Sequence, residues 1–497
     1  MAKISINFPP VKKPTPAVRN WSEYQEAIFD FAEQGSGNAI IEAVAGSGKT
    51  STIKECNRRV KGSKLFLAFN KDIVEELKQD GINARTFHSL CFGPAMQRVK
   101  AHNPSPDKLR SLVEHHFTGA EQKTYGHFST RLVSYARQVG IGCIQEDTVD
   151  NWLDLVNHHE VEIEDPEGKI EDGIGFARKL LKLSNESNDL DFDDMLYWAV
   201  LFQLPLPKFD WIFVDEAQDT NPIQRAILKK ISKPTTRLIA VGDPAQAIYG
   251  FRGADSESLS KIREEFEAIT LPLSVSYRCP RRVIEHARQW VSHIQPAPNA
   301  PEGEIIDLGE KWNIEIFKPE DLVVCRTSRP IVSLAFKMLQ NRMPVQILGR
   351  DLQEGLKATI NKMRARGIDQ LEKKLGAYAE REAKKANTPK EAAKAHGILD
   401  RVATIKVLIE GLTETNRTIP ALLTLIDTLF VTGPGKTTLS TIHKSKGLES
   451  KRVIWINPFP GQWAMQDWQA QQERNLCYVA TTRAIETLIL VCEPRRK

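Results

Sequence analysis

The stretch "NAIIEAVAGSGKTS", residues 38–51, decides the fold class of this chain. It indicates a short apolar strand, a glycine-rich turn and the start of a helix, which is the setting that a phosphate-binding loop requires. Gly46 and Gly48 carry no Cβ, so backbone N–H groups can approach phosphate oxygens, and the helix N-terminus adds partial positive charge. We therefore expect Lys49 to reach the β- and γ-phosphates of a nucleotide and Thr50 to hold Mg²⁺.

A second motif argues against a chance turn at this loop, where Ala43 replaces the Gly that opens the strict pattern. "WIFVDEAQD", residues 211–219, places Asp215 and Glu216 directly after four bulky apolar residues. In an open parallel sheet, the carboxyl ends of the strands form the edge where ligands bind. We expect Asp215 to hold Mg²⁺ through water and Glu216 to orient or deprotonate the attacking water. The alternative is that the two acids only cap the next helix.

Positive charge for the transition state of phosphoryl transfer is expected from much further along the chain. Arg278 in "SVSYRCP" and Arg483 in "YVATTRA" each follow a segment that would carry the arginine to an edge of a second α/β unit. Either arginine alone has the alternative of an ordinary surface residue. Only together with the ordered set of motifs described below are they expected to be more than surface residues.

The stretch "VGDPAQAIYGFRGAD", residues 241–255, puts an acid, an amide, two aromatic rings and an arginine into one short loop after an apolar strand. Such runs ordinarily end in Gly, Asn or Asp turn chemistry. Gln246 has a polar group suited to a phosphate, whereas Tyr249, Phe251 and Arg252 have flat groups suited to nucleobases. Simple core packing is the alternative for the two rings. The residue types of this loop therefore fit both a phosphate and a nucleobase.

Strand and helix signals alternate in two blocks, and a mostly helical, charged segment interrupts each block. This alternation predicts an α/β fold with two parallel sheets, each covered by helices on both faces. The expected boundaries are 1–95 plus 186–275 for the first domain, 96–185 for its helical insertion, 276–351 plus 433–497 for the second domain, and 352–432 for the small second insertion.

The composition is that of an ordinary globular chain that can bury several cores, with 497 residues, 41% of them hydrophobic and 26% charged. A formal net charge of +5 permits a nucleic-acid partner without requiring one. The seven cysteines are scattered and form no CxxC pair, which predicts reduced core thiols. We expect neither a signal peptide at "MAKISINFPPVKKPTP" nor a membrane helix, since no apolar run approaches the ~20 residues that such a helix needs.

Taken in order, the motifs resemble those of superfamily 1 DNA helicases of the UvrD/Rep type, in which Ala43 is ordinary. The short form is similar to phage-encoded members and to the F-box helicase. The resemblance covers both α/β units and implies two RecA-like P-loop domains. The matching stretches are "AVAGSGKT", "LAFNK", "ARTFHSL", "VDEAQD", "VGDPAQAIYGFRGA", "SYRCP", "STIHKSKGLE" and "NLCYVATTRA".

The resemblance implies a role for each matching residue. The implied catalytic residues are Lys49, Asp215, Glu216, Gln246, Arg278 and Arg483, with Thr50 and Asp215 as metal ligands. The implied nucleotide contacts are Gln25 and Tyr277 at adenine, Glu449 near the ribose or the metal, and the loop residues Ala45, Gly46, Ser47, Gly48, Lys49, Thr50 and Ser51. The implied DNA contacts are Phe69, Asn70, Thr86, His88, Tyr249, Phe251, Arg252, Thr441 and His443.

By resemblance, the chain is expected to be an ATP-dependent DNA helicase that uses ATP and Mg²⁺ and moves 3′ to 5′, as is typical of members with the aromatic-plus-arginine loop. The expected partners are single-stranded DNA, junctions of single and double strands, and replication or repair proteins. We expect a monomer in the cytoplasm of a bacterial or phage-infected cell, with no membrane partner. Two alternatives stay open: a DNA-stimulated ATPase that translocates or senses nucleic acid without unwinding, and a non-motor P-loop nucleotide switch. The short second insertion, and an end at Lys497 directly after the last strand, make hydrolysis a firmer expectation than unwinding.

Overall fold

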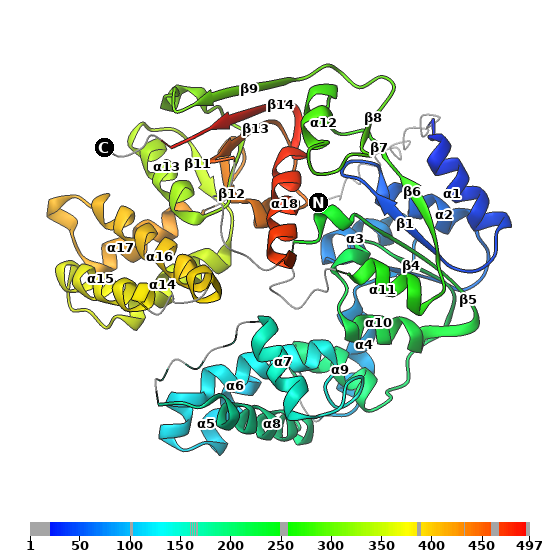
Figure 1. Cartoon of the computed structure of the whole chain (residues 1–497), viewed down its shortest axis with the longest axis horizontal. Coiled ribbons are helices and arrows are strands. Elements are labelled where there is room, and N and C mark those ends of the chain that lie inside the picture. The colour runs from blue at the N-terminus through cyan, green and yellow to red at the C-terminus, as the bar shows by residue number, and fades with distance from the viewer. Residues whose placement is uncertain are drawn as a thin grey trace, which may run out of the picture.

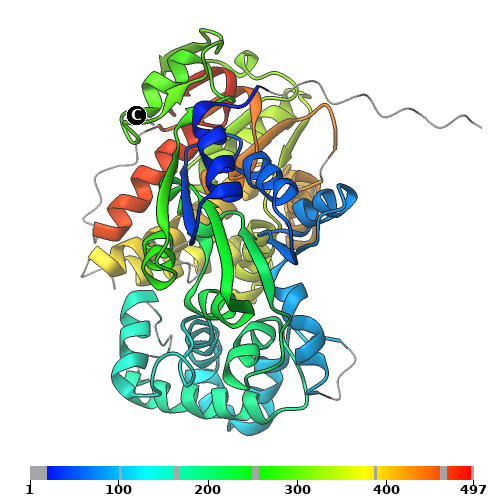
Figure 2. The same cartoon turned by 90° about the vertical axis from the view of Figure 1, so that its right-hand side faces the viewer.

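A computed structural model gives the fold of the chain, which consists of two α/β units with a helical lobe attached to each (Figures 1 and 2). Each unit contains one six-stranded sheet in which every paired strand is parallel. The predicted fold class is therefore confirmed. The structure describes residues 20–99, 103–159, 161, 163, 165, 167–248, 257–384, 389–431, 433–458 and 467–493.

The first sheet has the strand order β3-β2-β4-β5-β1-β6. Side chains alternate between its two faces, as the period of two in a strand requires. Ile212 and Leu238 enter the core on one face, whereas their neighbours Phe213 and Ile239 enter the core on the other. The strands are β1 (Ala39–Ala43), β2 (Lys64–Leu67), β3 (Ala84–Arg85), β4 (Phe209–Val214), β5 (Ser232–Gly242) and β6 (Ile269–Leu273).

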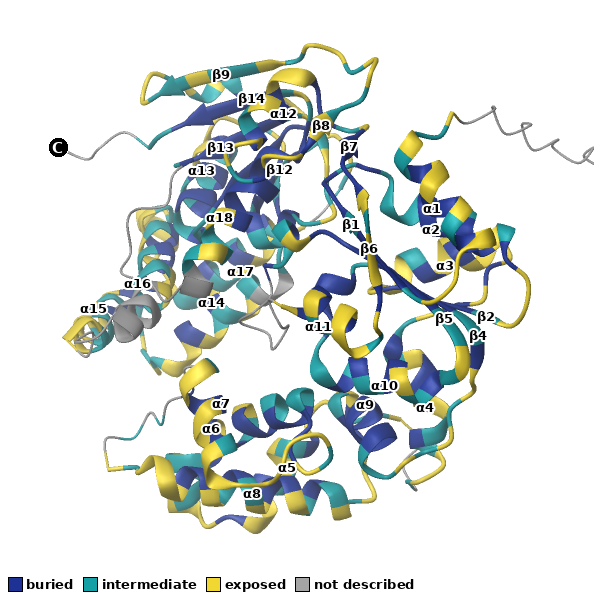
Figure 3. Ribbon diagram, turned by 45° about the vertical axis from the view of Figure 1, so that its right-hand side comes forward, coloured by how far each residue is buried: buried dark blue, intermediate teal, exposed yellow. Residues whose placement is uncertain are grey.

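Helices cover both faces of this sheet because both faces are apolar (Figure 3). The first of them begins at Glu23, because Ser22 caps it and forms a capping box with Gln25. One face carries α1 (Glu23–Gln34), α2 (Lys49–Arg59) and α3 (Lys71–Gln79). The other face carries α4 (Phe87–Met96), α10 (Pro222–Ile231) and α11 (Ser258–Glu265).

The first helical lobe lies between β3 and β4 in the chain and packs around a buried ion network. Lys108 Nζ is 2.6 Å from Asp194 Oδ2, and Arg137 lies 2.7 Å from Asp191 Oδ2 and 3.0 Å from Asp194 Oδ1. Asp191 also caps α9 through a capping box with Asp194. Buried charges are tolerated only when they are paired in this way. The helices of the lobe are α5 (Lys108–His116), α6 (Gly119–Val139), α7 (Val149–His159), α8 (Ile170–Glu186) and α9 (Phe192–Leu201).

The second sheet has the order β11-β12-β10-β13-β14-β9. Its inner strands also alternate, with Val324 and Trp455 in one core and Val323 and Ile454 in the other. The strands are β9 (Glu304–Gly309), β10 (Leu322–Cys325), β11 (Val345–Ile347), β12 (Thr437–Thr441), β13 (Ser450–Ile456) and β14 (Ala484–Val491). A separate short pair, β7 (Val275–Ser276) and β8 (Gln295–Pro296), lies between the two units in the chain.

Helices of the second unit divide between the same two cores. One core contains residues of α12 (Arg281–Ala287) and α18 (Asp467–Thr481). The other contains residues of α13 (Ser328–Gln340) and of the second lobe, which is formed by α14 (Arg350–Lys362), α15 (Ile368–Lys384), α16 (Pro389–Glu410) and α17 (Ile419–Leu429). Within the described part of the chain, no helix has the length and apolar character needed to span a membrane.

The two units share part of one hydrophobic core. Val44, Ala45 and Ile248 of the first unit pack into the cluster that contains Cys279 and Tyr478 of the second. In Figure 1, α18 lies at the centre of the molecule, close to this junction. α18 ends at Thr481, so that β14 can begin at Ala484 and pair with β13.

Candidate active site

The loop between β1 and α2 adopts the conformation that its glycines allow. Gly46 has φ of 71° and Gly48 has φ of 82°, both in the left-handed region. A Cβ on Gly46 would come within 2.4 Å of the Arg278 Cβ, so a larger residue there would collide with the second unit. The Ser47 hydroxyl is buried and, among the described residues, has no hydrogen-bond partner. A nucleotide phosphate oxygen is a suitable partner for such a group.

Thr50 and Asp215 come together at the predicted metal position. Thr50 Oγ1 donates a hydrogen bond to Asp215 Oδ2 at 2.6 Å. A hydroxyl and a carboxylate at the edge of a phosphate site match Mg²⁺, which takes few protein oxygens and keeps waters and phosphates as its other ligands. Burial, and then the neighbouring Glu216, raise the pKa of Asp215 to about 6. These two residues therefore fit the ion that the sequence predicts.

Glu216 is placed and charged as a base would need to be. Its backbone has φ of 50°, a left-handed conformation that is uncommon for a residue with a side chain and that occurs at functional sites. Its Oε1 lies 3.7 Å from Lys49 Nζ, and its Oε2 accepts a hydrogen bond from Gln218 at 2.5 Å. Burial raises its pKa, but Lys49 and Lys446 outweigh burial and lower the pKa of Glu216 to about 2. The carboxylate is ionised at neutral pH.

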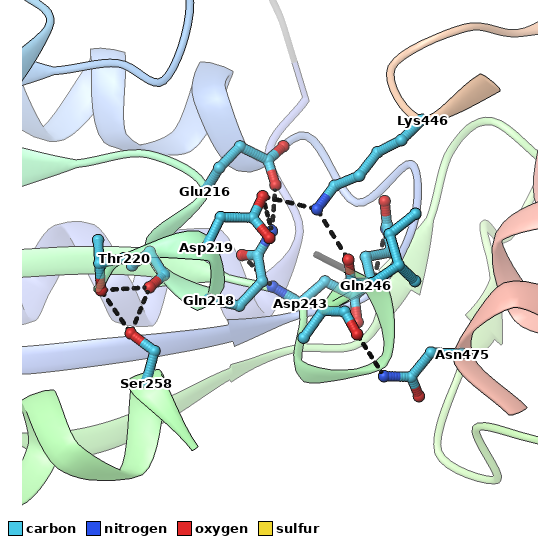
Figure 4. A network of polar contacts seen from close by, with 12 residues as sticks. Glu216, Gln218, Asp219, Thr220, Asp243, Gln246, Ser258, Lys446 and Asn475 are labelled. Atoms are coloured by element: carbon cyan, nitrogen blue, oxygen red, sulfur yellow. Dashed lines mark hydrogen bonds and ion pairs between the residues drawn. The ribbon is translucent and has the colours of Figure 1, made fainter. Parts of the chain in front are cut away.

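Lys446, which the sequence analysis did not single out, joins the two units at this site (Figure 4). Its Nζ forms an ion pair with Asp219 Oδ2 at 2.7 Å and donates to the Gln246 carbonyl at 2.7 Å. Gln246 is buried, and its Nε2 donates to Asp243 Oδ2 at 2.6 Å. Burial raises the pKa of Asp219 to about 6 although Lys446 opposes the shift. The second lysine of "HKSKGLE" is Lys446, and nothing else in that stretch of sequence points to its contact with Asp219.

The two predicted arginines reach the site from the second unit. Arg483 is fully buried just after α18, where its guanidinium donates to the carbonyls of Val479 and Leu448 at 3.0 and 3.1 Å. Burial, and then the nearby Arg278, lower the pKa of Arg483 to about 10, so it stays charged at neutral pH. The Nε atom of Arg278 lies 2.6 Å from Glu449 Oε2.

One pocket of about 460 Å³ collects most of these groups. Its walls come from both units, so its shape depends on their separation. The first unit contributes Gly46, Ser47, Gly48, Lys49, Thr50, Ser51, Phe69, Asn70, Ile73, Glu216, Asp219 and Gln246. The second unit contributes Arg278, Lys446, Gly447 and Arg483.

The predicted adenine and ribose contacts lie around the phosphate loop. Gln25 is buried and donates to Thr52 Oγ1 at 2.9 Å, and its Nε2 would be 3.5 Å from a Cβ on Gly48. Tyr277 is 48% exposed while its backbone N–H donates to the Gly46 carbonyl at 2.9 Å. Ala45 N–H donates to the Tyr478 hydroxyl at 2.8 Å. An exposed ring beside the loop is available for stacking, but the adenine role of Tyr277 and Gln25 stays a prediction.

The predicted DNA contacts that the structure describes lie at or shortly after the ends of strands in both units. Phe69 is 51% exposed after β2 and lines, together with His88 of α4, a second pocket of about 230 Å³. Phe69 and Asp219 line both pockets, so they form the wall between them. Burial lowers the pKa of His88. The other described residues of this set lie at helix starts or at a strand end. Asn70 caps α3 and Thr86 caps α4, whereas Thr441 is the last residue of β12 and His443 lies in the turn that follows it.

Three predicted DNA contacts, Tyr249, Phe251 and Arg252, lie outside the described residues. The chain leading to them is described as far as Ile248, which is buried in the core shared by the two units. Their roles therefore stay predictions.

Family comparisons match both units of the chain. The model described as the UvrD/REP helicase N-terminal domain matches residues 23–267. The model described as the UvrD-like helicase C-terminal domain matches residues 359–493. Together the two models cover the first sheet except β6, the second sheet except β9 to β11, and most of both lobes.

Individual relatives match over part of their length. The ATP-dependent DNA helicase PcrA of Staphylococcus epidermidis RP62A is 25% identical over 313 residues, which is 55% of this chain and 40% of that protein. The PcrA of Staphylococcus aureus Mu50 is 26% identical over 308 residues, with the same coverage of 55% and 40%. The matched region is thus less than half the length of these curated relatives. The solved complex of arterivirus nonstructural protein 10, a helicase, with DNA aligns at 13% identity and a TM-score of 0.34, covering 95% of this chain and 64% of that one.

Proposed function

Because the chain belongs to the UvrD/REP helicase family, we propose that it is an ATP-dependent DNA helicase that moves 3′ to 5′ along single-stranded DNA. One observation carries the proposal. The pocket between the units is lined by Lys49 and Glu216 of the first unit and by Arg278 and Arg483 of the second. Asp215 accepts a hydrogen bond from Thr50, which also lines this pocket. Residues arranged across two movable units can couple the hydrolysis of ATP to a change in their separation.

The phosphate chain of ATP would lie on the loop of residues 46–51, with Lys49 on the β- and γ-phosphates. When ATP binds, Lys49 would leave its ion pair with Glu216 and contact the phosphates instead. Glu216 would then orient the attacking water, because its low pKa keeps the carboxylate ionised. Mg²⁺, bound by Thr50 and Asp215, would neutralise charge on the phosphate oxygens. Arg278 and Arg483 would stabilise the charge that develops on the γ-phosphate, a contribution of about 10³–10⁵ in rate for an arginine finger.

Movement along DNA would follow from the pocket's dependence on both units. With ATP bound, Gln246 would sense the γ-phosphate from the first unit while Arg483 closes on it from the second. After hydrolysis the arginines lose their target and the units separate. Exposed aromatic groups such as Phe69 stack on any base at about 1–3 kcal/mol each, which suits a motor that steps along any sequence.

The proposal includes partners and place of action. Single-stranded DNA and its junctions with duplex would be the substrates, and replication or repair proteins would be further partners. The chain would act as a monomer in the cytoplasm of a bacterial or phage-infected cell. Support for this setting comes from the bacterial relatives that the chain resembles.

ATP hydrolysis with and without single-stranded DNA tests the proposal. We expect DNA to stimulate the wild-type rate, and Glu216→Gln to lower the stimulated rate by about 10²–10⁴, the contribution typical of a positioned base. Glu76→Gln is the matched control, because Glu76 is an exposed acid that pairs with Lys54 on the outer side of the first unit. An ATPase that ignores DNA would point to a nucleotide switch and overturn the motor. Stimulated hydrolysis without fork unwinding would restrict the function to translocation.

A further inference from the structure

Three consecutive carbonyls in the loop after β5 are held by side chains of the second unit. The Gln246 carbonyl accepts a hydrogen bond from Lys446 at 2.7 Å. The Ala247 carbonyl accepts one from Asn475 Nδ2 at 2.9 Å, and the Ile248 carbonyl accepts one from Gln472 Nε2 at 2.6 Å. The same Asn475 nitrogen lies 3.3 Å from the Pro244 carbonyl. Figure 4 shows Asn475 pointing into this loop from the helix opposite it.

The amide of Asn475 is oriented for this task. Asn475 is buried, and its Oδ1 accepts a hydrogen bond from Gln471 Nε2 at 2.9 Å. That bond turns the amide nitrogen, which is a donor, toward the loop carbonyls, which can only accept hydrogen bonds. A buried amide costs free energy unless its hydrogen bonds are made, so its place at the junction depends on the loop.

Gln472, Asn475 and Tyr478 lie three residues apart on α18 and therefore share one face of the helix. Tyr478 accepts a hydrogen bond from the Ala45 N–H of the phosphate loop at 2.8 Å. Arg483 follows the C-terminal end of the same helix. α18 thus contacts the phosphate loop, ends two residues before the predicted arginine finger, and holds the loop that leads toward the predicted DNA contacts.

We propose that Asn475 and Gln472 are positioning residues that fasten the loop of residues 246–248 to α18, so that closure on ATP moves the DNA-contacting loop. The inference rests on the proposed function and assigns a coupling role within it. These hydrogen bonds are accepted by backbone carbonyls, so they fix the backbone of residues 246–248 whatever its side chains are. Loss of the two donors should leave the nucleotide pocket in place but allow the loop to move independently of the second unit.

Variants that remove the donors test this role. Asn475→Asp and Gln472→Glu keep the size of each side chain but replace the donating nitrogen with an oxygen and add a carboxylate. Asn475→Ala and Gln472→Ala remove the amide without adding a charge, so a loss shared by both kinds of variant is due to the missing donor. Asn341→Ala is the matched control, because the exposed Asn341 amide donates to the Lys337 carbonyl at 2.8 Å at the end of α13, away from the pocket. Thermal unfolding of each variant shows whether the fold is retained.

The decisive measurement is the ratio of ATPase rates with and without single-stranded DNA, read beside the affinity for a fluorescent ATP analogue. We expect each single variant to lower this ratio about fivefold, the factor that corresponds to one hydrogen bond, and the double variant to lower it further. The DNA-free rate and the nucleotide affinity should stay within about twofold of wild type, as when a contact outside the binding pocket is lost.

The outcomes separate this inference from the proposed function. A wild-type enzyme whose ATPase ignores DNA overturns both. A wild-type enzyme that DNA stimulates, beside donor-free variants that are stimulated equally, overturns only the positioning role. Equal losses of the DNA-free and DNA-stimulated rates also overturn it, because they indicate general damage to the pocket. If a double variant fails to fold, the single donor-free variants carry the same comparison.

Discussion

Lys446 and Asp219 are 227 residues apart in the chain, yet they form a 2.7 Å ion pair in which the two side chains are 8% and 2% exposed. The pair joins the second unit to the acid motif of the first. Lys446 also donates a hydrogen bond to the Gln246 carbonyl. This one side chain therefore contacts the loop after β4, through Asp219, and the loop after β5, through Gln246.

Replacing Lys446 with Met should destabilise the protein, and more so at higher pH. Removing one partner of a buried pair costs about 3–5 kcal/mol, because it leaves the other charge buried alone. The pKa of Asp219 is already raised to about 6 and should rise further without Lys446, so the penalty is small at pH 5, where the acid is protonated, and full at pH 8. Urea unfolding at both pH values measures this.

Two further variants make the Lys446 result specific. Asp219→Asn combined with Lys446→Met should recover part of the lost stability, since no charge is then left unpaired. Lys451→Met serves as the control, because Lys451 and Glu486 form an exposed pair at 3.1 Å that contributes about 0–1 kcal/mol. A loss that is equal at pH 5 and pH 8 would show that Asp219 is not the group left uncompensated.

The Mg²⁺ concentration that ATP hydrolysis requires should depend on pH, because the pKa of Asp215 is raised. Its folded pKa of about 6 means that the carboxylate is mostly ionised at pH 7 and becomes protonated as the pH falls through 6. The Mg²⁺ concentration needed for half-maximal hydrolysis should then rise, by up to about tenfold for each pH unit below the pKa.

Glu216→Gln isolates the contribution of Asp215 to that profile. Glu216 is the second cause of the raised pKa after burial, so removing its charge should move the midpoint of binding to lower pH. The nucleotide's own titration is the same in both proteins and cancels in the comparison. Binding of Mg²⁺ with an ATP analogue, which needs no turnover, gives the two midpoints. Identical midpoints in wild type and variant would contradict the assignment.

Arg483→Lys should slow hydrolysis while preserving the binding of ATP. A lysine keeps the charge but lacks the planar fork that donates to the Val479 and Leu448 carbonyls and reaches the pocket. We expect kcat to fall by about 10³ or more, as for a lost arginine finger, with nucleotide affinity changed only a few-fold. Arg282→Lys is the control, since Arg282 pairs with Glu302 on the surface at 3.0 Å. Equal kcat values in the two variants would remove Arg483 from the reaction.

Asp194→Asn should separate stability from activity. Asp194 neutralises both Lys108 and Arg137 in the core of the first lobe, so its loss should cost about 3–5 kcal/mol in the free energy of unfolding. The network lies outside both the phosphate loop and the acid motif, so ATP affinity in the folded protein should not change. If Asp194→Asn unfolds with the same free energy as the wild type, Asp194 does not stabilise the buried charges of Lys108 and Arg137.

The sequence was sufficient to predict features that depend on local chemistry. The strand–loop–helix at residues 38–51 and the acids after β4 were predicted because apolar strands and glycine turns leave a clear local pattern. β6 escaped prediction because Pro272 interrupts it. The structure places β6 at the edge of its sheet, where a missing backbone donor is tolerated.

Contacts between the units could not be predicted in the same way. Lys446, Asn475 and Gln472 acquire their partners only when the two units pack together, because each partner lies at least 200 residues away in the sequence. A lone lysine or amide in a helix has no local feature that distinguishes it from a solvated surface residue. The arginines were predictable only as members of an ordered set of motifs.

Directional movement is the central claim, and release of streptavidin from biotinylated single-stranded DNA measures it most directly. A motor that runs 3′ to 5′ should release streptavidin from a 5′-biotinylated strand faster than from a 3′-biotinylated one. Release should require ATP and Mg²⁺ and should be abolished by Glu216→Gln. Release that is equal at both ends, that favours the 3′ end, or that proceeds without ATP would contradict the account.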